Sequence, residues 1–423
     1  MLNVLINAYA VCPNMGSEPG MGWNWCVNLA KHCELHIITE GEFRDEIEMA
    51  VVALPQKKNM HFYYNPVSDD VRRMCWNQGD WRFYKYYKEW QWKTYLIAKE
   101  ICKDVQIDIL HQLNMIGFRE PGYLWKLSKE YSLPLVWGPI DAKEAYPIAY
   151  SSGGSVWAKI FLCIKNIITM AQLKWAPRVR QMVKYADVVV AASSNSVKSI
   201  CDYQKVRSIL INETGCVDTL IEIDVVDKNN KSGIDLLWVG KLDFRKQLGL
   251  ALKVLGRLNA LNVTLHIVGG GDATPYATIA KKLGVNDKCV WYGSIPHSEV
   301  QGLMRFCDLL IFTSVAEGTP HVVLESIANN LPVVCFDTCG QGDVVTKSVG
   351  RKIPLSTPKR SIEDFAREIE YFYGNRSELQ CLSENCNIRK RELSWDNKIR
   401  QMVNLYEDVL KKKNHEPLHS YTV

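Results

Sequence analysis

The sequence predicts an α/β fold made of two Rossmann-like, doubly wound domains that face a central cleft. Three observations support this fold class. The chain has 423 residues, which is more than one ordinary hydrophobic core organises. Continuous runs of Val, Ile and Leu alternate with segments of helical length, as in a parallel sheet that helices cover on both faces. The alternation stops at a polar segment, residues 224–233, and then starts again, so we expect ligands at the carboxyl ends of the strands of two sheets.

The strand-like runs assign one domain to each half of the sequence. The N-terminal domain, residues 1–223, has six runs, at 2–8, 34–40, 59–65, 107–113, 133–139 and 186–193. After the predicted linker at 224–233, the C-terminal domain at 234–394 has five, at 233–240, 263–270, 288–294, 307–314 and 331–337. Helices are expected near 246–260, 273–284, 297–306 and 320–330, and further along at 361–373, 377–391 and 395–412. We expect the helix at 395–412 to pack back on the N-terminal domain and the tail at 413–423 to be disordered.

The composition argues against several classes of protein. Hydrophobic residues make up 47% and charged residues 23% of the chain, which is typical of a folded globular protein. The formal net charge of +5 is too small to indicate binding of nucleic acid. No run of about 18 uncharged apolar residues predicts a transmembrane helix, and the N-terminus lacks the basic segment of a signal peptide. The 14 cysteines are scattered without a CxxC pair, so we predict free thiols, no metal site and a cytoplasmic location.

Three polar or glycine-rich segments of the second half each follow a predicted strand. The first contains Lys241 and Lys246, whose cations could meet a diphosphate; a solvated loop is the alternative. The second is Gly269-Gly270-Gly271, which indicates a tight turn and not the G-x-G-x-x-G pattern. No acidic residue ends the next strand, which argues against a dinucleotide-dependent oxidoreductase.

The third segment, residues 317–325, contains two carboxylates around a predicted helix start. Thr319 is a suitable N-cap and Pro320 a suitable first helical residue. The backbone N–H groups and the positive end of such a helix favour a phosphate. Glu317 lies before the helix and Glu325 inside it, so each carboxylate could accept hydrogen bonds from hydroxyl groups. The spacing alone leaves open two solvated glutamates.

The order of these segments resembles the donor domain of glycosyltransferase family 4, which has the GT-B fold. The resemblance rests on VGKLDFRK, HIVGGGD, VWYGSIPHSEV and CDLLIFTSVAEGTPHVVLESIANNLPVV, and it covers residues 233–340 closely. It implies that Glu325 binds the ribose of a nucleotide-sugar and that Glu317 binds hydroxyls of the transferred sugar. It also implies that Lys246 binds the diphosphate and, with Glu317, forms the catalytic set. The other donor-site residues that it implies are Gly270, Gly318, Thr319, Pro320 and Val323, with Trp291–Ile295 beside the base.

The donor segments depart from the family pattern at two positions. Lys241 stands where the family more often has Arg, which keeps the cation but loses bidentate geometry. Gln247 replaces the usual Gly after Lys246. The donor assignment therefore depends most on Lys246, Glu317 and Glu325.

A glycine-rich loop with Gly16, Gly20 and Gly22 follows the first predicted strand. Three glycines before a helix let a backbone approach a ligand closely, although a plain flexible loop gives the same pattern. Family 4 enzymes have such a loop facing the donor phosphate and the acceptor. The variant GSEPGMGWNW resembles a bacterial subgroup involved in surface polysaccharides. These three glycines are therefore predicted to contact the donor.

The histidine that many family members carry after the strand at 133–139 is missing, because the chain reads GPIDAKE from residue 138. His111, Asp141 and Glu144 are the candidate substitutes on the acceptor side. A lone polar residue at a strand end often only caps a loop, so this alternative stays open for each.

Residues 72–96 and 156–180 combine aromatic or apolar side chains with Lys and Arg. Both segments fit a surface with Trp and Tyr at the level of lipid headgroups. Helices packed on their own domain, with Lys and Arg reaching into solvent, are the alternative. Contact with the inner membrane surface therefore stays open beside a cytoplasmic location.

The resemblance implies a retaining, metal-independent glycosyltransferase that uses a UDP- or GDP-sugar and no further cofactor. Its acceptor would be a glycan or a lipid-linked saccharide in surface polysaccharide synthesis. Two other functions stay open: a nucleotide-sugar epimerase of the same fold, and a non-catalytic partner subunit that binds a sugar nucleotide. The reaction products distinguish these three functions.

Overall fold

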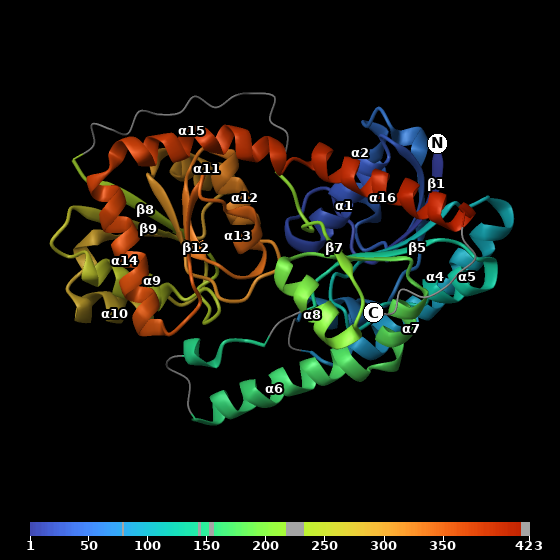
Figure 1. Cartoon of the computed structure of the whole chain (residues 1–423), viewed down its shortest axis with the longest axis horizontal. Helices are drawn as coiled ribbons and strands as arrows, with labels where there is room; N and C mark the ends of the chain where they lie inside the picture. The colour runs from blue at the N-terminus through green and yellow to red at the C-terminus, as the bar shows by residue number, and fades with distance from the viewer. Residues whose placement is uncertain (78–79, 143–144, 152–155, 217–231, 416–423) are drawn as a thin grey trace. The chain divides into compact units, whose positions relative to one another are not determined.

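Two parallel sheets, each in its own unit, organise the computed structural model of the chain (Figure 1). The structure describes residues 1–77, 80–142, 145–151, 156–216 and 232–415. Unit 1 comprises Met1–Ala145, Ile167–Thr214 and Trp395–Val423, and unit 2 comprises Tyr146–Asn166 and Gly215–Ser394. Glu144 and all but the last two residues of the predicted linker lie outside the described residues.

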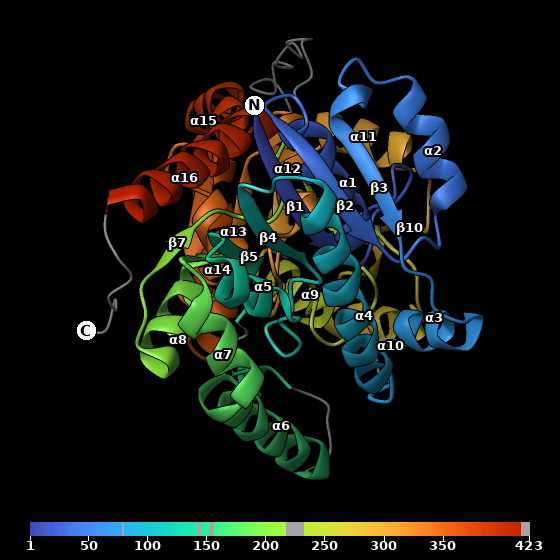
Figure 2. The ribbon, with the colours of Figure 1, turned by 90° about the vertical axis from the view of Figure 1, so that its right-hand side faces the viewer.

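The sheet of unit 1 has seven parallel strands in the order β3-β2-β1-β4-β5-β6-β7 (Figure 2). Along the chain these strands are β1 Leu2–Ala8, β2 Cys33–Thr39, β3 Met60–Tyr64, β4 Ile109–Asn114, β5 Leu135–Ile140, β6 Val188–Ala191 and β7 Ser208–Leu210. The helices of this unit are α1 Ser17–Leu29, α2 Arg44–Val52, α3 Asp69–Trp76, α4 Phe83–Asp104, α5 Leu124–Tyr131, α7 Pro177–Tyr185, α8 Ser194–Gln204 and α16 Trp395–His415. The boundary between the units falls inside α6, Val156–Trp175.

Helices cover both faces of this sheet. Val4 and Ile6 of β1 pack with α1 and α16, whereas Leu5 packs with α4, α5 and α7 on the opposite face. Successive side chains of a strand point to opposite faces, so a strand covered on both sides must be apolar throughout. This requirement explains the continuous apolar runs of the sequence.

The sheet of unit 2 has six parallel strands in the order β10-β9-β8-β11-β12-β13. Its strands are β8 Ile234–Val239, β9 Val263–Val268, β10 Cys289–Gly293, β11 Leu309–Phe312, β12 Val333–Phe336 and β13 Gly350–Ile353. Its helices are α9 Leu248–Arg257, α10 Thr274–Leu283, α11 His297–Phe306, α12 His321–Ala328, α13 Cys339–Val344, α14 Pro358–Gly374 and α15 Arg376–Glu392. Helices α9, α10 and α14 pack on one face and α11, α12 and α13 on the other. The predicted α/β class with two doubly wound sheets is therefore confirmed.

The structure differs from the sequence-based boundaries in three places. Strands β7 and β13 were not predicted, because each is a short edge strand that pairs on one side only. Helix α16 extends to His415 and so includes the first residues of the predicted tail. Residues 146–166 were assigned to the N-terminal domain, but they belong to unit 2. The reason is Tyr150, which is buried against Phe336 and shares a 2.7 Å hydrogen bond with the Ser361 hydroxyl.

Candidate functional site

The order of strands in unit 2 creates a switch point between β8 and β11. The chain runs outward from β8 through β9 to β10 and then returns to place β11 on the other side of β8. In open sheets of this kind, ligands bind beyond the carboxyl ends of the strands at the point where the order reverses. Lys246 lies in the loop after β8 and Glu317 in the loop after β11. The two predicted catalytic residues therefore follow the two strands that flank this point.

Lys246 and Glu317 form an ion pair, with 2.5 Å between Lys246 Nζ and Glu317 Oε1. Their side chains are only 20% and 17% exposed. The Ser314 hydroxyl donates to the same carboxylate oxygen at 2.5 Å. Charge-assisted contacts of this length fix the orientation of a carboxylate. The structure thus brings together two residues that are 71 positions apart in the sequence.

Hydrogen bonds tie the loops after β8 and β11 to one another. The Thr313 hydroxyl donates to the carbonyl of Lys246 at 2.8 Å and accepts from the Trp238 indole N–H at 3.1 Å. The backbone N–H of Val315 donates to the carbonyl of Arg245 at 3.2 Å. Because Trp238 is buried, these bonds anchor the ion pair to the core of the unit.

The turn that carries the cations is held by Asp243. Its carboxylate pairs with the Arg245 guanidinium at 2.9 Å and accepts from the backbone N–H of Arg245 at 2.8 Å. Burial acts to raise the pKa of Asp243, but the hydrogen bonds from Arg245 outweigh it and the pKa lies below its ordinary value. The hydrogen bond to Asp243 in turn raises the pKa of Arg245. Lys241, by contrast, is exposed to solvent.

Gln247 has a φ of +55°, a left-handed conformation that favours glycine. This conformation gives a physical reason for the glycine that is usual after the lysine in family 4. In this chain the Gln247 side chain donates to the carbonyls of Tyr150 and Phe244, both at 2.6 Å. These two hydrogen bonds compensate for the strained backbone, and they attach residues 146–151 to the first turn of α9.

The glycine segment after β9 permits close contact between neighbouring loops. Gly269 has a φ of +147°, and a Cβ there would lie 1.8 Å from the carbonyl oxygen of Gly240. Any other residue would therefore push the loops after β8 and β9 apart. Gly270 accepts a 2.9 Å hydrogen bond from the N–H of Leu242, which continues the contact.

Helix α12 begins one residue later than the sequence predicted. It starts at His321, so Pro320 is the N-cap residue, and no side chain caps the helix. Thr319 precedes it and is buried. The backbone N–H of Gly340 donates to the carbonyl of Gly318 at 2.9 Å, which attaches this loop to the first turn of α13. Val323 is fully buried in the hydrophobic core, so its side chain faces away from any ligand at the loop.

Glu325 lies in α12 and is 34% exposed. Its Oε1 is 3.2 Å from Nε2 of His297, the first residue of α11. His321, one turn earlier on α12, is more enclosed, and burial lowers the pKa of its imidazole. The Glu325 carboxylate is thus accessible, whereas the Glu317 carboxylate is largely enclosed by Lys246 and Ser314.

The predicted glycines of unit 1 have different surroundings. Helix α1 begins at Ser17, so Gly20 and Gly22 lie inside the helix and not in the loop before it. A Cβ on Gly20 would lie 2.0 Å from the carbonyl oxygen of Met15, and one on Gly22 would lie 2.3 Å from that of Ala10. Both glycines therefore accommodate the chain's own backbone. Gly16 is exposed, and a Cβ there would meet nothing within 4 Å.

His111 lies in the middle of β4 and is fully buried. Its Nε2 donates to the carbonyl of Gly138 at 2.5 Å, and its Nδ1 accepts from the Tyr406 hydroxyl at 2.6 Å. Burial lowers the pKa of His111 to about 4, so the ring is neutral at pH 7. Asp141, just after β5, is also buried and accepts from the Ser196 hydroxyl at 3.4 Å. Both side chains are committed to contacts within unit 1.

Sequence reasoning missed Glu18, which lies in the first turn of α1. Its carboxylate accepts from the backbone N–H of Ile116 at 2.5 Å, and so joins the loops after β1 and β4. These two strands flank the switch point of the first sheet. The sequence signal for Glu18 was a single glutamate among the glycines of the predicted loop, and no separate role was assigned to it.

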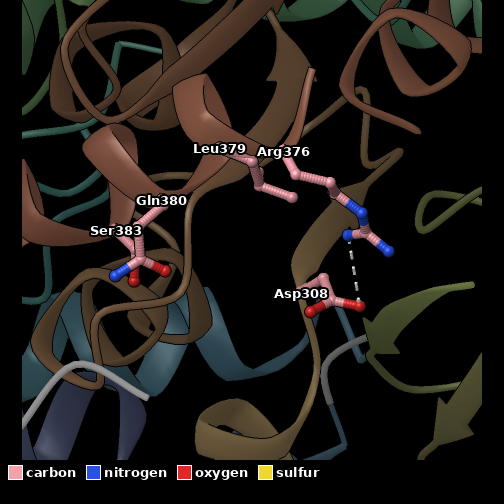
Figure 3. Close-up of a pocket in the computed structure, with 5 residues that line it drawn as sticks. All are labelled: Asp308, Arg376, Leu379, Gln380 and Ser383. Carbon is pink, nitrogen blue, oxygen red and sulfur yellow. Dashed lines mark ion pairs between the residues drawn. The ribbon is translucent and has the colours of Figure 1, made fainter. Parts of the chain in front are cut away.

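Two other groups of polar residues lie at the opposite, amino ends of the strands. Glu34, His36 and His61 are close enough to hold a metal ion, and His61 Nε2 is 3.1 Å from the Glu34 carboxylate. Figure 3 shows a pocket in which the Arg376 guanidinium points toward Asp308, with 3.7 Å between Nη1 and Oδ2. Asp308 directly precedes β11 and accepts from the backbone N–H of Asp235 at 2.8 Å. Within unit 2, Asp308 and Glu317 lie at opposite ends of β11.

With this geometry in place, comparison with protein families gives a match over the second half of the chain. Residues 222–389 match the sequence profile of the family described as glycosyl transferases group 1. This stretch of the chain is therefore similar in sequence to group 1 glycosyl transferases. The matched range includes every donor-site residue predicted in unit 2, from Lys241 to Glu325.

Two curated relatives of this chain are bacterial proteins. Protein CapJ of Staphylococcus aureus is 24% identical over 238 residues, which cover 55% of this chain and 56% of CapJ. Lipopolysaccharide 1,6-galactosyltransferase of Salmonella typhimurium is 28% identical over 197 residues, covering 44% of this chain and 52% of that protein. The chain thus spans about half the length of the curated relatives it matches.

Solved structures show the fold of the whole chain. The apo form of the lipopolysaccharide outer core galactosyltransferase WaaB aligns with a TM-score of 0.64 and 15% identity, covering 96% of this chain and 99% of WaaB. HepE of Anabaena in complex with UDP aligns with a TM-score of 0.60 and 14% identity, covering 96% of this chain and 100% of HepE. The fold is therefore GT-B, as the resemblance implied.

Proposed function

We propose that this protein is a retaining glycosyltransferase of the family 4 type that transfers a sugar from a nucleotide-sugar to a saccharide acceptor. The observation that carries the proposal is the Lys246–Glu317 pair at the β8/β11 switch point, inside the residues that match the group 1 family. An enclosed cation next to a carboxylate offers one group for a diphosphate and one for sugar hydroxyls. Glu325, in the same segment, remains accessible for a ribose.

In the proposed reaction, the bond between the anomeric carbon of the sugar and the diphosphate oxygen breaks, and the acceptor hydroxyl forms the new bond on the same face. The hydroxyl proton passes to a phosphate oxygen of the leaving diphosphate. Lys246 stabilises the negative charge that develops on this leaving group, and Lys241 adds a second cation from the same turn. Glu317 holds the sugar. A role as general base is less suited to it, because Lys246 and Ser314 already contact its carboxylate.

We propose that lysine cations, and no metal ion, neutralise the diphosphate. Lys246 is positioned for this by the bonds from Thr313 to its carbonyl and by the pair with Glu317. If so, adding EDTA leaves turnover unchanged, and adding Mg²⁺ or Mn²⁺ does not increase it. A requirement for either ion would contradict this part of the proposal.

The acceptor that we propose is a glycan or a lipid-linked saccharide of a bacterial surface polysaccharide, used at the cytoplasmic face of the membrane. This proposal is supported by the similarity to the lipopolysaccharide 1,6-galactosyltransferase of Salmonella typhimurium, which by its name acts on a bacterial surface polysaccharide. The fold neighbour HepE is solved with UDP-glucose, so UDP-sugars come before GDP-sugars as candidate donors.

The test of the function is a screen of UDP- and GDP-sugars for thermal stabilisation, followed by product analysis with saccharide acceptors. A bound donor should raise the unfolding temperature by mass action. A new glycoside with unchanged anomeric configuration supports the proposal. An isomerised nucleotide-sugar would show an epimerase, and donor binding without any product would show a non-catalytic subunit.

Two substitutions test the assignment of residues. Glu325→Ala should weaken donor binding, and Lys246→Ala should lower turnover by at least ~10-fold, since it removes a cation at the developing charge. Lys282→Ala, an exposed lysine on α10, is the matched control and should match the wild type in both assays. Donor affinity equal to that of the wild type in Glu325→Ala would refute the ribose assignment.

A further inference from the structure

Helix α6 exposes a continuous apolar stripe. Trp157 is 78% exposed, Phe161 65% and Ile164 50%. Further large apolar side chains that are exposed on this helix are Val156, Ile160, Ile167, Ile168 and Trp175. Residues 157, 161, 164, 168 and 175 recur at intervals of three, four and seven positions, which places them on one face of an α-helix.

The opposite face of α6 is the one that packs on protein. Leu173 is buried with Val179 and Met182, and Thr169 is buried beside Arg119, whose guanidinium donates to its hydroxyl at 2.9 Å. The helix already has polar and apolar contacts on this side. Its most apolar face is therefore turned away from the core. An amphipathic helix that served only to cover its own domain would turn this face toward the core.

The charge of this region is one-sided. Residues 156–185, which form α6 and α7, contain six basic residues and no acidic residue. The whole chain has a formal net charge of only +5, so these 30 positions carry more positive charge than the entire protein does on balance. Lys165 and Lys174 lie along α6 to either side of the apolar stripe, whereas Lys159 lies on the opposite face.

The second aromatic and basic segment, residues 72–96, is arranged differently. Phe83, Tyr87 and Trp90 of α4 are buried and pack edge-to-face around Tyr9. Trp76, Trp81, Tyr84 and Trp92 of this segment are exposed, but they stand among the acidic residues Asp80 and Glu89. Helix α6 differs in that its exposed apolar face lies in a stretch without any acidic residue.

A large exposed apolar patch on a folded protein marks an interaction surface. No helix in the described part of the chain is long and apolar enough to cross a bilayer. An apolar face flanked by lysines, with Trp at both ends of the stripe, has the properties of a helix that lies in a membrane interface. The absence of acidic residues in 156–185 matches an anionic surface.

We propose that α6 is a membrane anchor that lies in the plane of an anionic lipid bilayer. Trp157, Phe161 and Ile164 enter the boundary between headgroups and acyl chains, and the flanking lysines contact the headgroups. The inference rests on the proposed function in one respect, the use of a lipid-linked acceptor at the membrane face. It identifies the element that holds the protein there.

The test uses the full chain and vesicles of phosphatidylcholine alone or with phosphatidylglycerol. We expect sedimentation with the anionic vesicles at low salt, weaker sedimentation at high salt, and little with the neutral vesicles. Replacing Trp157, Phe161 and Ile164 together by Ser should lower the partition coefficient at least ~100-fold, since three large apolar side chains no longer enter the bilayer. Substituting Lys174 by Gln should lower it about fivefold, on anionic vesicles only.

Ile388→Ser on α15 is the matched control, because Ile388 is 61% exposed but lies outside the stripe. It should bind vesicles as the wild type does. Because the three α6 side chains are exposed, the triple variant should keep the unfolding temperature of the wild type. Wild-type protein that fails to bind anionic vesicles at low salt overturns the proposal, as does a triple variant that binds normally. A wild-type dimer that becomes monomeric in the triple variant, without vesicle binding in either, would assign the stripe to a second copy of the chain.

Donor hydrolysis in solution separates this inference from the proposed function. Loss of vesicle binding with unchanged donor turnover in the triple variant supports the anchor. Vesicle binding without turnover of any nucleotide-sugar would leave the anchor in place and refute the glycosyltransferase proposal.

Discussion

The Lys246–Glu317 pair has a consequence for any anionic ligand that approaches the switch point. The two side chains neutralise one another at 2.5 Å, and both are largely shielded from water. A diphosphate that binds Lys246 must therefore compete with Glu317 for the ammonium group. Removing the carboxylate should free the cation for phosphate and at the same time remove the group proposed to hold the sugar.

We therefore expect Glu317→Gln to separate nucleotide affinity from sugar transfer. UDP alone should bind as tightly as to the wild type or up to ~10-fold more tightly, because a competing charge close to Lys246 is lost. Transfer from a UDP-sugar should fall at least ~10-fold. Calorimetric titration with UDP and an assay of kcat/KM measure the two effects. Weaker UDP binding in the variant would show that Glu317 supports the nucleotide and does not compete with it.

His111 gives a prediction of pH dependence in unit 1. Burial lowers the pKa of this imidazole from 6.5 in the unfolded chain to about 4 in the folded protein. Below pH 6.5 the unfolded chain takes up a proton that the folded protein refuses, so stability falls as the pH drops from 6.5 to 4. The loss attributable to His111 is roughly 3 kcal/mol over this range.

The measurement is the free energy of unfolding of the wild type and of His111→Gln between pH 7.5 and 4, taken about every half pH unit. Other groups titrate in both proteins, so the difference between the two curves isolates His111. The variant should be less stable at pH 7, because the bonds to Gly138 and Tyr406 are disturbed, but should lose less stability on acidification. Parallel curves would contradict the prediction.

Residues in the loops after apolar runs were the ones that the sequence could bring together. Lys246 and Glu317 each lie in such a loop, and parallel strands end at one edge of a sheet. The surroundings of His111 could not be predicted in this way, because its partner Tyr406 is 295 positions away. The contact between Ser314 and Glu317 depends on side-chain rotamers, which the pattern does not encode.

At the scale of elements, the start of helix α1 differs from the position that its glycines predicted. Gly16, Gly20 and Gly22 predicted a loop, but the helix begins at Ser17 and includes Gly20 and Gly22. The cause is a tertiary contact: the chain before α1 passes so close that a Cβ at Gly22 would lie 2.3 Å from the Ala10 carbonyl oxygen. These glycines thus make room for backbone, and tertiary packing outweighs their low helix propensity.

Gly22→Ala should consequently destabilise unit 1 by about 1–3 kcal/mol, the usual cost of forcing extra volume into a packed site. The new methyl group would meet both the Ala10 carbonyl and the Asn114 amide, which are hydrogen-bonded to one another at 2.7 Å. Urea-induced unfolding measures the change.

Gly302→Ala is the control, because Gly302 lies in α11 with nothing within 4 Å of its Cβ position. It should be neutral or stabilise by up to ~1 kcal/mol, since Ala is the better helix former. Equal effects of the two substitutions would show that the contact at Gly22 carries no penalty.

At the scale of the whole molecule, neither unit is a continuous stretch of sequence. Residues 146–166 join unit 2, and α16 joins unit 1 after the chain has completed unit 2. We expected the helix at 395–412 to pack back on the N-terminal domain, and α16 belongs to unit 1. The sequence did not predict the assignment of residues 146–166, because that depends on Tyr150 entering a core that is formed by distant residues.

This organisation predicts the effect of a C-terminal truncation. Trp395, Met402 and Tyr406 of α16 are buried in the core of unit 1, and Trp395 packs edge-on against Trp25. A chain that ends at Ser394 would expose this surface and leave His111 without its partner. Each large side chain that is lost from a core costs about 2–5 kcal/mol, so the sum approaches the total stability of an ordinary domain.

We expect unit 1 of the truncated chain to unfold or to lose its cooperative transition, while unit 2 keeps its own. Differential scanning calorimetry shows whether one transition disappears, and limited proteolysis followed by mass spectrometry shows which unit is cut.

Tyr406→Phe provides a milder version, since it removes only the hydroxyl that donates to His111 and should cost about 1–3 kcal/mol. A chain that ends at His415 keeps all of α16 and serves as the control. If the chain ending at Ser394 unfolds as the control does, the returning helix is dispensable, and the core of unit 1 is complete without the residues that α16 places in it.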